Sequence, residues 1–277
     1  MEGGDTVDAR AIGVFDSGMG GLTAVRELIR RLPGEDVVYF GDTGRVPYGS
    51  RGTSTIIKYA RQDVAFLRTF DLKAIVIACG TVSTIALDIV ASENPLPVIG
   101  VVEPAAQAAA AATKTGRIGL VGTKATIASG AYERALDRLL PGAEVTAVAC
   151  PLFVPLVENG RYQAGDPLVE LVVSEYLAPF KAAGVDTLVL GRTHYPLLWD
   201  AISNYLGPDV TLISSGAACV DTVARLLAER DMLSGKTQGG THRYFASDSA
   251  RDFGALASIF LGEDIQGQAK QIAIENY

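Results

Sequence analysis

Short apolar runs alternate with helical periodicity over the first hundred residues. Residues 11–15, 37–40 and 74–78 are apolar runs without a polar interruption. Such runs are typical of parallel strands that are covered on both faces. Within residues 22–32 and 57–67, apolar residues instead recur every three or four positions, which predicts helices. The order strand, helix, strand, helix, strand predicts a parallel α/β sheet.

The same pattern begins again near residue 98. Pro95 and Pro97 end the preceding helix, and residues 117–123 repeat the pattern of residues 11–17. A later apolar run, residues 188–190, ends in small and polar residues as the run at 74–78 does. From the first to the third strand the spacing is 63 residues in one half and 70 in the other. The similar spacing of the strands in the two halves indicates an internal duplication.

We predict an α/β protein made of two pseudo-symmetric α/β lobes with mainly parallel sheets. The first lobe comprises residues 1–98 and 209–277, and the second comprises residues 99–208. A strand at 210–213 and an edge strand at 243–246 are expected to return the chain to the first lobe. Ligands of open α/β sheets bind beyond the carboxyl ends of the strands, so polar residues at those ends are candidates for function.

Composition and charge favour a small-molecule ligand. The 277 residues are 48% hydrophobic, enough for a sizeable core, and carry a formal net charge of −7. The chain has no stripe of Lys and Arg that could neutralise phosphates, which argues against a nucleic-acid partner. Its start lacks the basic and apolar regions of a signal peptide, and no 18-residue uncharged apolar segment occurs. We therefore expect a cytoplasmic protein that makes no membrane contact.

Neither a cofactor nor a metal is expected. The glycine-rich segment 18–23 follows a strand, but Thr23 replaces the third glycine of the dinucleotide fingerprint. Segment 235–237 has the Gly-Lys-Thr of a P-loop without its earlier glycine or a preceding strand. His194 and His242 are the only two histidines and show no metal-ligand spacing. The three widely spaced cysteines support neither a disulfide framework nor a CxxC site.

Cys79 is the strongest candidate for chemistry. It ends an apolar run and precedes a predicted helix, where backbone N–H groups and the helix dipole lower the pKa of a thiol. Asp16 and Ser17 end the first strand, so these three side chains are expected at one edge of the sheet. The simpler interpretation of Asp16 and Ser17 is an ordinary helix cap. Cys150 and Cys219 are interpreted as small buried hydrophobic residues.

Specific motifs follow the strand ends throughout the chain. They are Phe15-Asp16-Ser17-Gly18 with Gly20-Gly21-Leu22, Gly41-Asp42 with Pro47-Tyr48-Gly49, Ala78-Cys79 with Thr81, Val102-Glu103-Pro104, Cys150-Pro151 with residues 153–158, and Leu190-Gly191 with residues 193–196. Together they resemble the glutamate racemase family of the cofactor-independent aspartate/glutamate racemase superfamily, over nearly the whole chain. The resemblance implies two pseudo-symmetric α/β lobes with the ligand in the crevice between them.

The resemblance also implies a mechanism. The family uses two cysteine thiols on opposite faces of the α-carbon, one removing a proton and the other returning it, without cofactor or metal. Cys79 would be the base that acts on the D enantiomer. Asp16 and Glu158 would be auxiliary carboxylates beside the thiols, and His194 would assist on the second side.

Glutamate is the substrate that the resemblance implies, and its carboxylates and amine need many polar partners. The residues implied to bind it are Asp16, Ser17, Tyr48, Gly49, Gly80, Thr81, Thr193 and His194. The D-glutamate formed would serve peptidoglycan synthesis, and through it cell wall biogenesis and cell shape. A homodimer is implied as well.

Two positions depart from the family's pattern. Gly80 stands where the family usually has Asn, so one amide contact is missing. Arg192 stands at the position of the second catalytic cysteine, and a guanidinium with a pKa above about 12 cannot exchange a proton at neutral pH. Three interpretations remain open: a glutamate racemase whose turnover Arg192 impairs, a non-racemising ligand-binding or regulatory homologue, and an enzyme that uses Cys79 alone, such as a decarboxylase.

Overall fold

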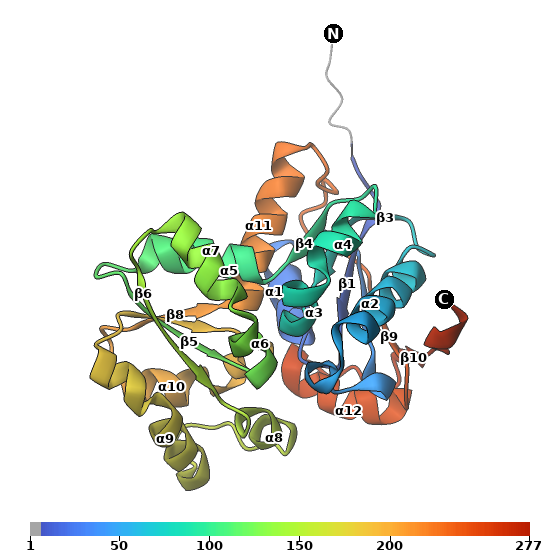
Figure 1. The fold of residues 1–277 in the computed structure, drawn as a ribbon. Coiled ribbons are helices and arrows are strands. Elements are labelled where there is room, and N and C mark those ends of the chain that lie inside the picture. Colours follow the sequence, from blue (N-terminus) through green and yellow to red (C-terminus); the bar gives the residue numbers. More distant parts are fainter. Residues whose placement is uncertain (1–6) are drawn as a thin grey trace. The chain divides into compact units, whose positions relative to one another are not determined.

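The computed structural model describes residues 7–277, apart from the side chains at positions 252 and 255, and these residues form two compact units. The first unit joins the chain up to Gly100 to Cys219–Tyr277, and the second is Val101–Ala218. Each unit consists of one parallel sheet with helices packed against it (Figure 1). The predicted α/β class with parallel sheets is confirmed. Within residues 7–277, no helix has the length and apolar character needed to cross a membrane.

The first unit contains a six-stranded sheet whose paired strands are all parallel. In spatial order the strands are β10 (Ala269–Gln271), β9 (His242–Ala246), β2 (Val37–Gly41), β1 (Ala11–Asp16), β3 (Leu72–Ile77) and β4 (Val98–Gly100). In β1, Phe15 lies opposite Phe40 on one side and Ile77 on the other. Every residue of β1, β2 and β3 is buried, as expected for parallel strands covered on both faces.

Helices cover both faces of this sheet. They are α1 (Leu22–Arg31), α2 (Thr53–Leu67), the short α3 (Gly80–Ile85) and α4 (Leu87–Ser92), and α12 (Ala250–Leu261). On one face, Val64 of α2 belongs to the same apolar cluster as Phe15 and Phe40. On the other face, Tyr39 stacks on Phe253 of α12 with ring centroids 6.2 Å apart. The side chains of neighbouring residues in one strand therefore pack against helices on opposite faces of the sheet.

The second unit contains a four-stranded parallel sheet. Its strands, in spatial order, are β6 (Glu144–Ala149), β5 (Arg117–Gly122), β7 (Thr187–Leu190) and β8 (Thr211–Ser214). Its helices are α5 (Val102–Ala112), α6 (Lys124–Ser129), α7 (Ala131–Leu139), α8 (Phe153–Glu158), α9 (Pro167–Ala183) and α10 (Trp199–Leu206). Buried alanines of α5 pack with Ile118, Leu120 and Val189 of the sheet. A further helix, α11 (Ser215–Glu229), begins in this unit and continues into the first.

The two units share one strand order. The orders β2-β1-β3-β4 and β6-β5-β7-β8 both place the first strand between the second and the third, with the fourth outside the third. This equivalence agrees with the duplication predicted from the spacing of the apolar runs. The first unit additionally carries β9 and β10 beside β2, both from the C-terminal part of the chain.

The chain passes from the first unit to the second, and back again, at other residues than those predicted. β4 pairs with β3, which keeps residues 98–100 in the first unit, and β8 pairs with β7, which keeps residues 209–218 in the second. Strand pairing decides both cases, and the apolar pattern carries no information about pairing. The segment 243–246 is not an edge strand, because β9 lies between β2 and β10.

A buried ion pair joins four segments of the chain at the amino edge of the six-stranded sheet. Lys73 in β3 and Glu35 just before β2 form this pair, and their side chains are 0% and 3% exposed. Lys73 Nζ also donates to the carbonyl oxygens of Asp8 and Met232, both at 2.8 Å. Glu35 Oε1 accepts the N–H of Ser234 at 2.7 Å. A counter-ion together with hydrogen bonds of this kind is what allows charges to be buried.

We predict that Lys73→Met destabilises the protein, because it leaves the Glu35 carboxylate buried without its counter-ion. The expected loss in the free energy of unfolding is about 3–5 kcal/mol, measured by denaturation in urea. The matched control is Lys58→Met, since Lys58 is an exposed lysine on α2; it should change stability by less than about 0.5 kcal/mol. Equal effects of the two substitutions would contradict the stabilising role of the buried pair.

Candidate active site

Three of the predicted residues meet at the carboxyl edge of the six-stranded sheet. β1 ends in Asp16, Ser17 follows it, and Cys79 comes two residues after the end of β3. Cys79 Sγ donates to Ser17 Oγ at 3.3 Å. The three side chains are buried, none being more than 3% exposed. They meet because β1 and β3 are parallel neighbours, so both strands end at the same edge.

The turn after β1 places Asp16 against the start of α1. Asp16 Oδ2 accepts the N–H of Gly21 at 3.0 Å. A side chain at position 21 would bring its Cβ to 2.6 Å from the Asp16 Cβ, so glycine is required for this close approach. The Tyr39 hydroxyl donates to the Gly18 carbonyl at 2.9 Å and holds the same turn. Asp16 therefore holds the N-cap residue Gly21 in place, but it is not the ordinary side-chain cap of the simpler interpretation, because no side chain makes the cap hydrogen bond of α1.

Gly80 and Thr81 are the first residues of α3 and lie directly after Cys79. Thr81 is 1% exposed, and its Oγ1 has no hydrogen-bond partner within the described part of the chain. Leaving a buried hydroxyl without a partner costs about 1–3 kcal/mol. An orphaned hydroxyl beside a buried thiol supports the prediction that Thr81 contacts a ligand.

Tyr48 and Gly49 lie in the turn Tyr48–Ser50, and only Gly49 of the two is exposed. The Tyr48 hydroxyl contacts the carboxyl groups of Asp42 and Asp63, so its ring points into the unit. A substrate contact by this pair would accordingly come from the backbone of the turn and not from the phenol.

In the second unit, the residues after β7 form a separate polar group. His194 Nε2 lies 3.1 Å from Glu158 Oε1, and His194 Nδ1 lies 3.4 Å from Thr193 Oγ1. Glu158 is the last residue of α8, and its side chain is 42% exposed. The hydrogen bond from His194 lowers the pKa of Glu158 against the effect of burial, and the charges of His194 and Arg192 lower it further. The structure thus brings together Glu158 and His194, two of the residues that the resemblance implied for the site.

Arg192 comes two residues after β7 and is partly buried. Its Nε atom is buried and makes no hydrogen bond to any residue in the range 7–277. The guanidinium is close enough to Glu158 to lower the pKa of that carboxyl group. The position of the family's second cysteine thus holds a permanent cation, and one of its donors is accepted by none of the described residues.

Cys150 and Cys219 are inert by their surroundings. Both side chains are 0% exposed, and burial raises the pKa of each thiol to about 12. Cys150 Sγ lies 3.7 Å from the backbone carbonyl oxygen of Val148. These properties agree with their interpretation as small buried hydrophobic residues.

No metal centre is apparent among residues 7–277, which contain no group of three or more His, Cys, Asp or Glu side chains arranged to hold an ion. His242 lies in β9, where burial lowers the pKa of its imidazole.

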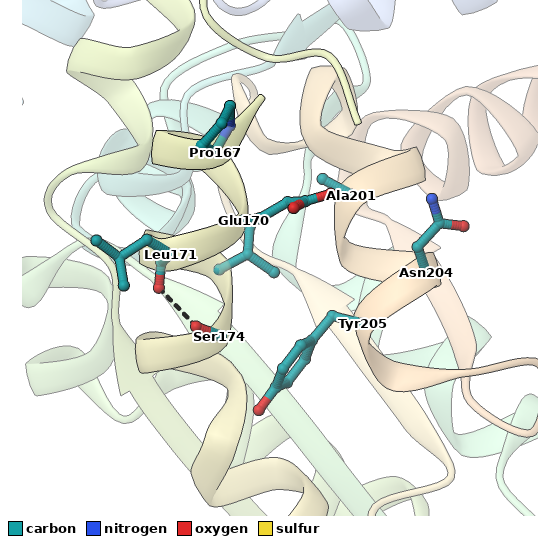
Figure 2. Close-up of a pocket in the computed structure, with 8 residues that line it drawn as sticks. Pro167, Glu170, Leu171, Ser174, Ala201, Asn204 and Tyr205 are labelled. Atoms are coloured by element: carbon teal, nitrogen blue, oxygen red, sulfur yellow. Dashed lines mark hydrogen bonds between the residues drawn. The ribbon is translucent and has the colours of Figure 1, made fainter. Parts of the chain in front are cut away.

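A cavity of about 510 Å³ lies between α9 and α10 of the second unit (Figure 2). It is lined by Pro167, Glu170, Leu171, Val173 and Ser174 of α9 and by Ala201, Asn204 and Tyr205 of α10. Ser174 uses its hydroxyl to donate to the Leu171 carbonyl at 2.8 Å, as the dashed line in Figure 2 marks. The cavity contains none of the predicted site residues, so it is distinct from the candidate active site.

Three further residues surround Tyr48, namely Asp42, Arg45 and Asp63; the sequence analysis noted Asp42 only as part of a motif and missed Arg45 and Asp63. Asp42 and Asp63 are both 0% exposed. The available signal for Asp63 was its place in α2 beside the buried residues Ala60 and Val64, where a carboxylate is unexpected.

Comparison with known proteins places the chain in a family. The sequence model of the family described as Asp/Glu/Hydantoin racemase matches residues 16–223. A glutamate racemase from Geobacter metallireducens is 44% identical over 266 residues, which is 96% of this chain and 97% of the relative. The crystal structure of a glutamate racemase isoform from Bacillus anthracis has a TM-score of 0.90 at 38% identity, covering 96% of this chain and 98% of the other.

The glutamate racemase of Francisella tularensis, solved in complex with D-glutamate, has a TM-score of 0.88 at 37% identity, covering 98% of this chain and all of the other. The duplicated parallel α/β units and these matches define the class of protein. This chain belongs to the Asp/Glu/Hydantoin racemase family, and the predicted resemblance is confirmed.

We predict that Cys79 is the thiol that iodoacetamide modifies in the folded protein. At pH 8 a thiol of pKa about 12 is ionised in only about one molecule in ten thousand, so Cys150 and Cys219 should react very slowly. Mass spectrometry should therefore find one label per wild-type chain and none in folded Cys79→Ala. Unfolding in urea is the control, after which Cys79→Ala should take up two labels. Rapid labelling of folded Cys79→Ala would refute the prediction.

Proposed function

We propose that this protein is an isomerase of the glutamate racemase type, which acts on the α-carbon of glutamate without a cofactor. The buried group of Cys79, Ser17 and Asp16 at the carboxyl edge of the sheet is the observation that carries the proposal. Similarity to glutamate racemases over 96% of the chain supports the same substrate, as does a similar structure that binds D-glutamate.

The chemistry assigned to Cys79 is proton exchange. The α-proton of an amino acid is very weakly acidic, so a base must act from close by in a site that excludes water. The Cys79 thiolate would remove the proton from D-glutamate, leaving a carbanion whose charge spreads into the α-carboxylate. The thiol so formed exchanges its hydrogen with solvent and then returns a proton to the same face of the carbanion, which regenerates the thiolate. Ser17, through its contact with the sulfur at 3.3 Å, would keep the thiolate aligned.

Binding is assigned to polar groups of both units. The orphaned hydroxyl of Thr81 and the exposed Gly49 would contact the substrate from the first unit, together with Asp16, Ser17 and Gly80. In the second unit, Thr193 and His194 would contact it, with Glu158 holding the imidazole through its 3.1 Å contact.

Arg192 limits the second half of a two-base reaction. Its guanidinium holds its protons at neutral pH and cannot supply one to the opposite face of the α-carbon. The chain therefore retains one-sided exchange at Cys79, and full racemisation is slow unless another group donates. A second candidate function, binding of an anionic ligand without turnover, is favoured by the buried Arg192 Nε that lacks a partner among the described residues.

The biological setting follows from the proposed reaction. D-Glutamate would supply peptidoglycan synthesis, and so cell wall biogenesis and cell shape, in the cytoplasm. A homodimer is proposed on the same family grounds.

We predict that the protein exchanges the α-proton of D-glutamate in heavy water with retention of configuration, because the thiol that removes the proton also returns it. L-Glutamate presents its proton to the opposite face and should exchange roughly 100-fold more slowly. Proton NMR follows loss of the α signal, and chiral chromatography checks the configuration. Cys79→Ala should abolish the exchange, whereas Cys150→Ala should retain it.

The outcomes of this experiment separate the candidate functions. Binding of glutamate with no exchange on either enantiomer would reject the one-base reaction in favour of the binding protein. Equal exchange on both enantiomers would mean that another group, such as His194 acting through water, replaces the missing thiol.

We also predict that Arg192→Cys raises the rate of glutamate racemisation by roughly 100-fold, the usual contribution of a positioned acid or base. Circular dichroism of L-glutamate over time measures the rate. Arg192→Ser is the matched control, because it removes the cation without adding a titratable group. An equal gain in both variants would show that the bulk or charge of Arg192, and not the missing proton donor, limits the reaction.

A further inference from the structure

Four side chains form a nearly closed polar cluster behind the turn Tyr48–Ser50. Asp42, Tyr48 and Asp63 are at most 1% exposed, and the Arg45 side chain is 11% exposed. Arg45 Nε donates to Asp42 Oδ2 at 2.6 Å, and Arg45 Nη2 donates to Asp63 Oδ1 at 2.9 Å. The Tyr48 oxygen makes a close hydrogen bond with Asp42 Oδ2 and lies 3.0 Å from Asp63 Oδ2.

If both carboxyl groups were ionised, the cluster would have too few hydrogens to make both of the hydrogen bonds between Tyr48 and the two aspartates. The Tyr48 hydroxyl carries one hydrogen, and a carboxylate can only accept. Tyr48 can therefore donate to one aspartate, and its oxygen can be satisfied by the other only if that aspartate carries a proton. Charge leads to the same result, since one arginine balances one carboxylate, and a second buried negative charge would be uncompensated.

The contacts identify which aspartate carries the proton. Asp42 has two further donors, because Arg45 Nε lies 2.6 Å from its Oδ2 and Ser247 Oγ lies 2.7 Å from its Oδ1. Among the residues that the structure describes, Asp63 has only the 2.9 Å contact from Arg45 in addition to Tyr48. Burial raises the pKa of Asp63 well above its usual value, and the neighbouring charge of Asp42 raises it further.

We propose that Asp63 is a positioning residue that stays protonated at neutral pH and, by donating to Tyr48 while Tyr48 donates to Asp42, fixes the turn Tyr48–Ser50. This role rests on the proposed function insofar as the exposed backbone of that turn contacts substrate. The cluster ties the turn to α2, because Asp63 belongs to that helix, and Arg45 also donates to Gln62 at 2.6 Å. The Arg45 guanidinium lies over the Tyr59 ring, 4.1 Å from its centroid.

A fixed turn matters for binding a dicarboxylate. Backbone groups act as efficient binding elements only when their geometry is set before the ligand arrives. Gly49 has no side chain to anchor it, and the phenol of Tyr48 is the anchor of the turn. Asp63 therefore acts on substrate through Tyr48 and does not touch it.

The first test is the pH dependence of stability in wild type and Asp63→Asn. A group protonated in the folded state and ionised in the unfolded state makes stability fall as pH rises, from the unfolded pKa up to the folded pKa. Asn keeps a donor for Tyr48 and an acceptor for Arg45, but it has no proton to release. The unfolding constant of wild type relative to Asp63→Asn should rise about tenfold per pH unit between about pH 5 and pH 7.

The charged and titratable groups facing Asp63 are Asp42, Arg45, Tyr48 and Asp16, and all are unchanged in this comparison. Asp71→Asn is the matched control, because Asp71 is an exposed aspartate of the same unit. It should leave the ratio to wild type flat over the same pH range. A flat ratio for Asp63→Asn as well would mean that Asp63 is ionised when folded and would overturn the proposal.

The second test measures the turn itself. The N–H of Arg51 donates to the Tyr48 carbonyl at 2.9 Å, so its hydrogen exchange reports the closure of the turn. Exchange at Arg51 should increase at least tenfold in Asp63→Ala and Asp42→Asn and stay within twofold of wild type in Asp63→Asn. Similar acceleration in Asp63→Asn and Asp42→Asn would overturn the assignment of the proton to Asp63. No acceleration in Asp63→Ala would overturn the positioning role.

The third measurement connects the cluster to substrate. In the D-glutamate exchange assay, KM should rise at least tenfold in Asp63→Ala with a smaller change in kcat, and Asp63→Asn should restore KM to within about threefold of wild type. A wild-type protein without any exchange would count against the proposed function alone, since the pH and hydrogen-exchange tests do not use glutamate. Altered turn closure with an unchanged KM would overturn the link to substrate.

Discussion

Parallel pairing of the strands is the constraint on which the rest of this molecule depends. Because neighbouring strands point the same way, whatever follows each strand is delivered to the same edge of the sheet. In the first unit, β1, β2 and β3 deliver Asp16, Asp42 and Cys79 to that edge. In the second unit, β7 delivers the group containing Arg192 and His194. The sheets thus concentrate chemistry from positions far apart in the chain.

This arrangement forces the six-stranded sheet to accommodate charges at both of its edges. Lys73 and Glu35 lie at the amino edge, and the cluster of Asp42, Arg45 and Asp63 lies at the carboxyl edge. The amino-edge pair has one cation and one anion. The carboxyl-edge cluster has one cation and two acids, and this imbalance makes a neutral aspartic acid the stable solution there. The cost of burying an uncompensated charge therefore shapes both the stabilising pair at the amino edge and the positioning cluster at the carboxyl edge.

The sequence was sufficient for the class of fold, and it selected candidate residues that the structure places at one edge of the sheet. Unbroken apolar runs marked β1, β2 and β3, and the residue types after them identified Asp16 and Cys79. The unit boundaries were shifted because hydrogen bonds between strands decide them, and β10, with the sequence Ala-Lys-Gln, has no apolar pattern to reveal it. Asp63 escaped notice although it stands on the apolar face of α2, three residues after Ala60 and four before Leu67, because a single acidic residue in an amphipathic helix is usually solvent-facing.

The discontinuous first unit has a consequence for the order of events during synthesis. Its strand β2 pairs with β9, which begins at His242, although β2 itself ends at Gly41. Between these points lies the whole of the second unit, which is one continuous segment and can be completed earlier. At 5–20 residues per second, the outer edge of β2 waits on the order of 10–40 s for its partner. Through that interval the nascent chain carries an unpaired apolar strand edge, the kind of surface that chaperones and neighbouring chains bind.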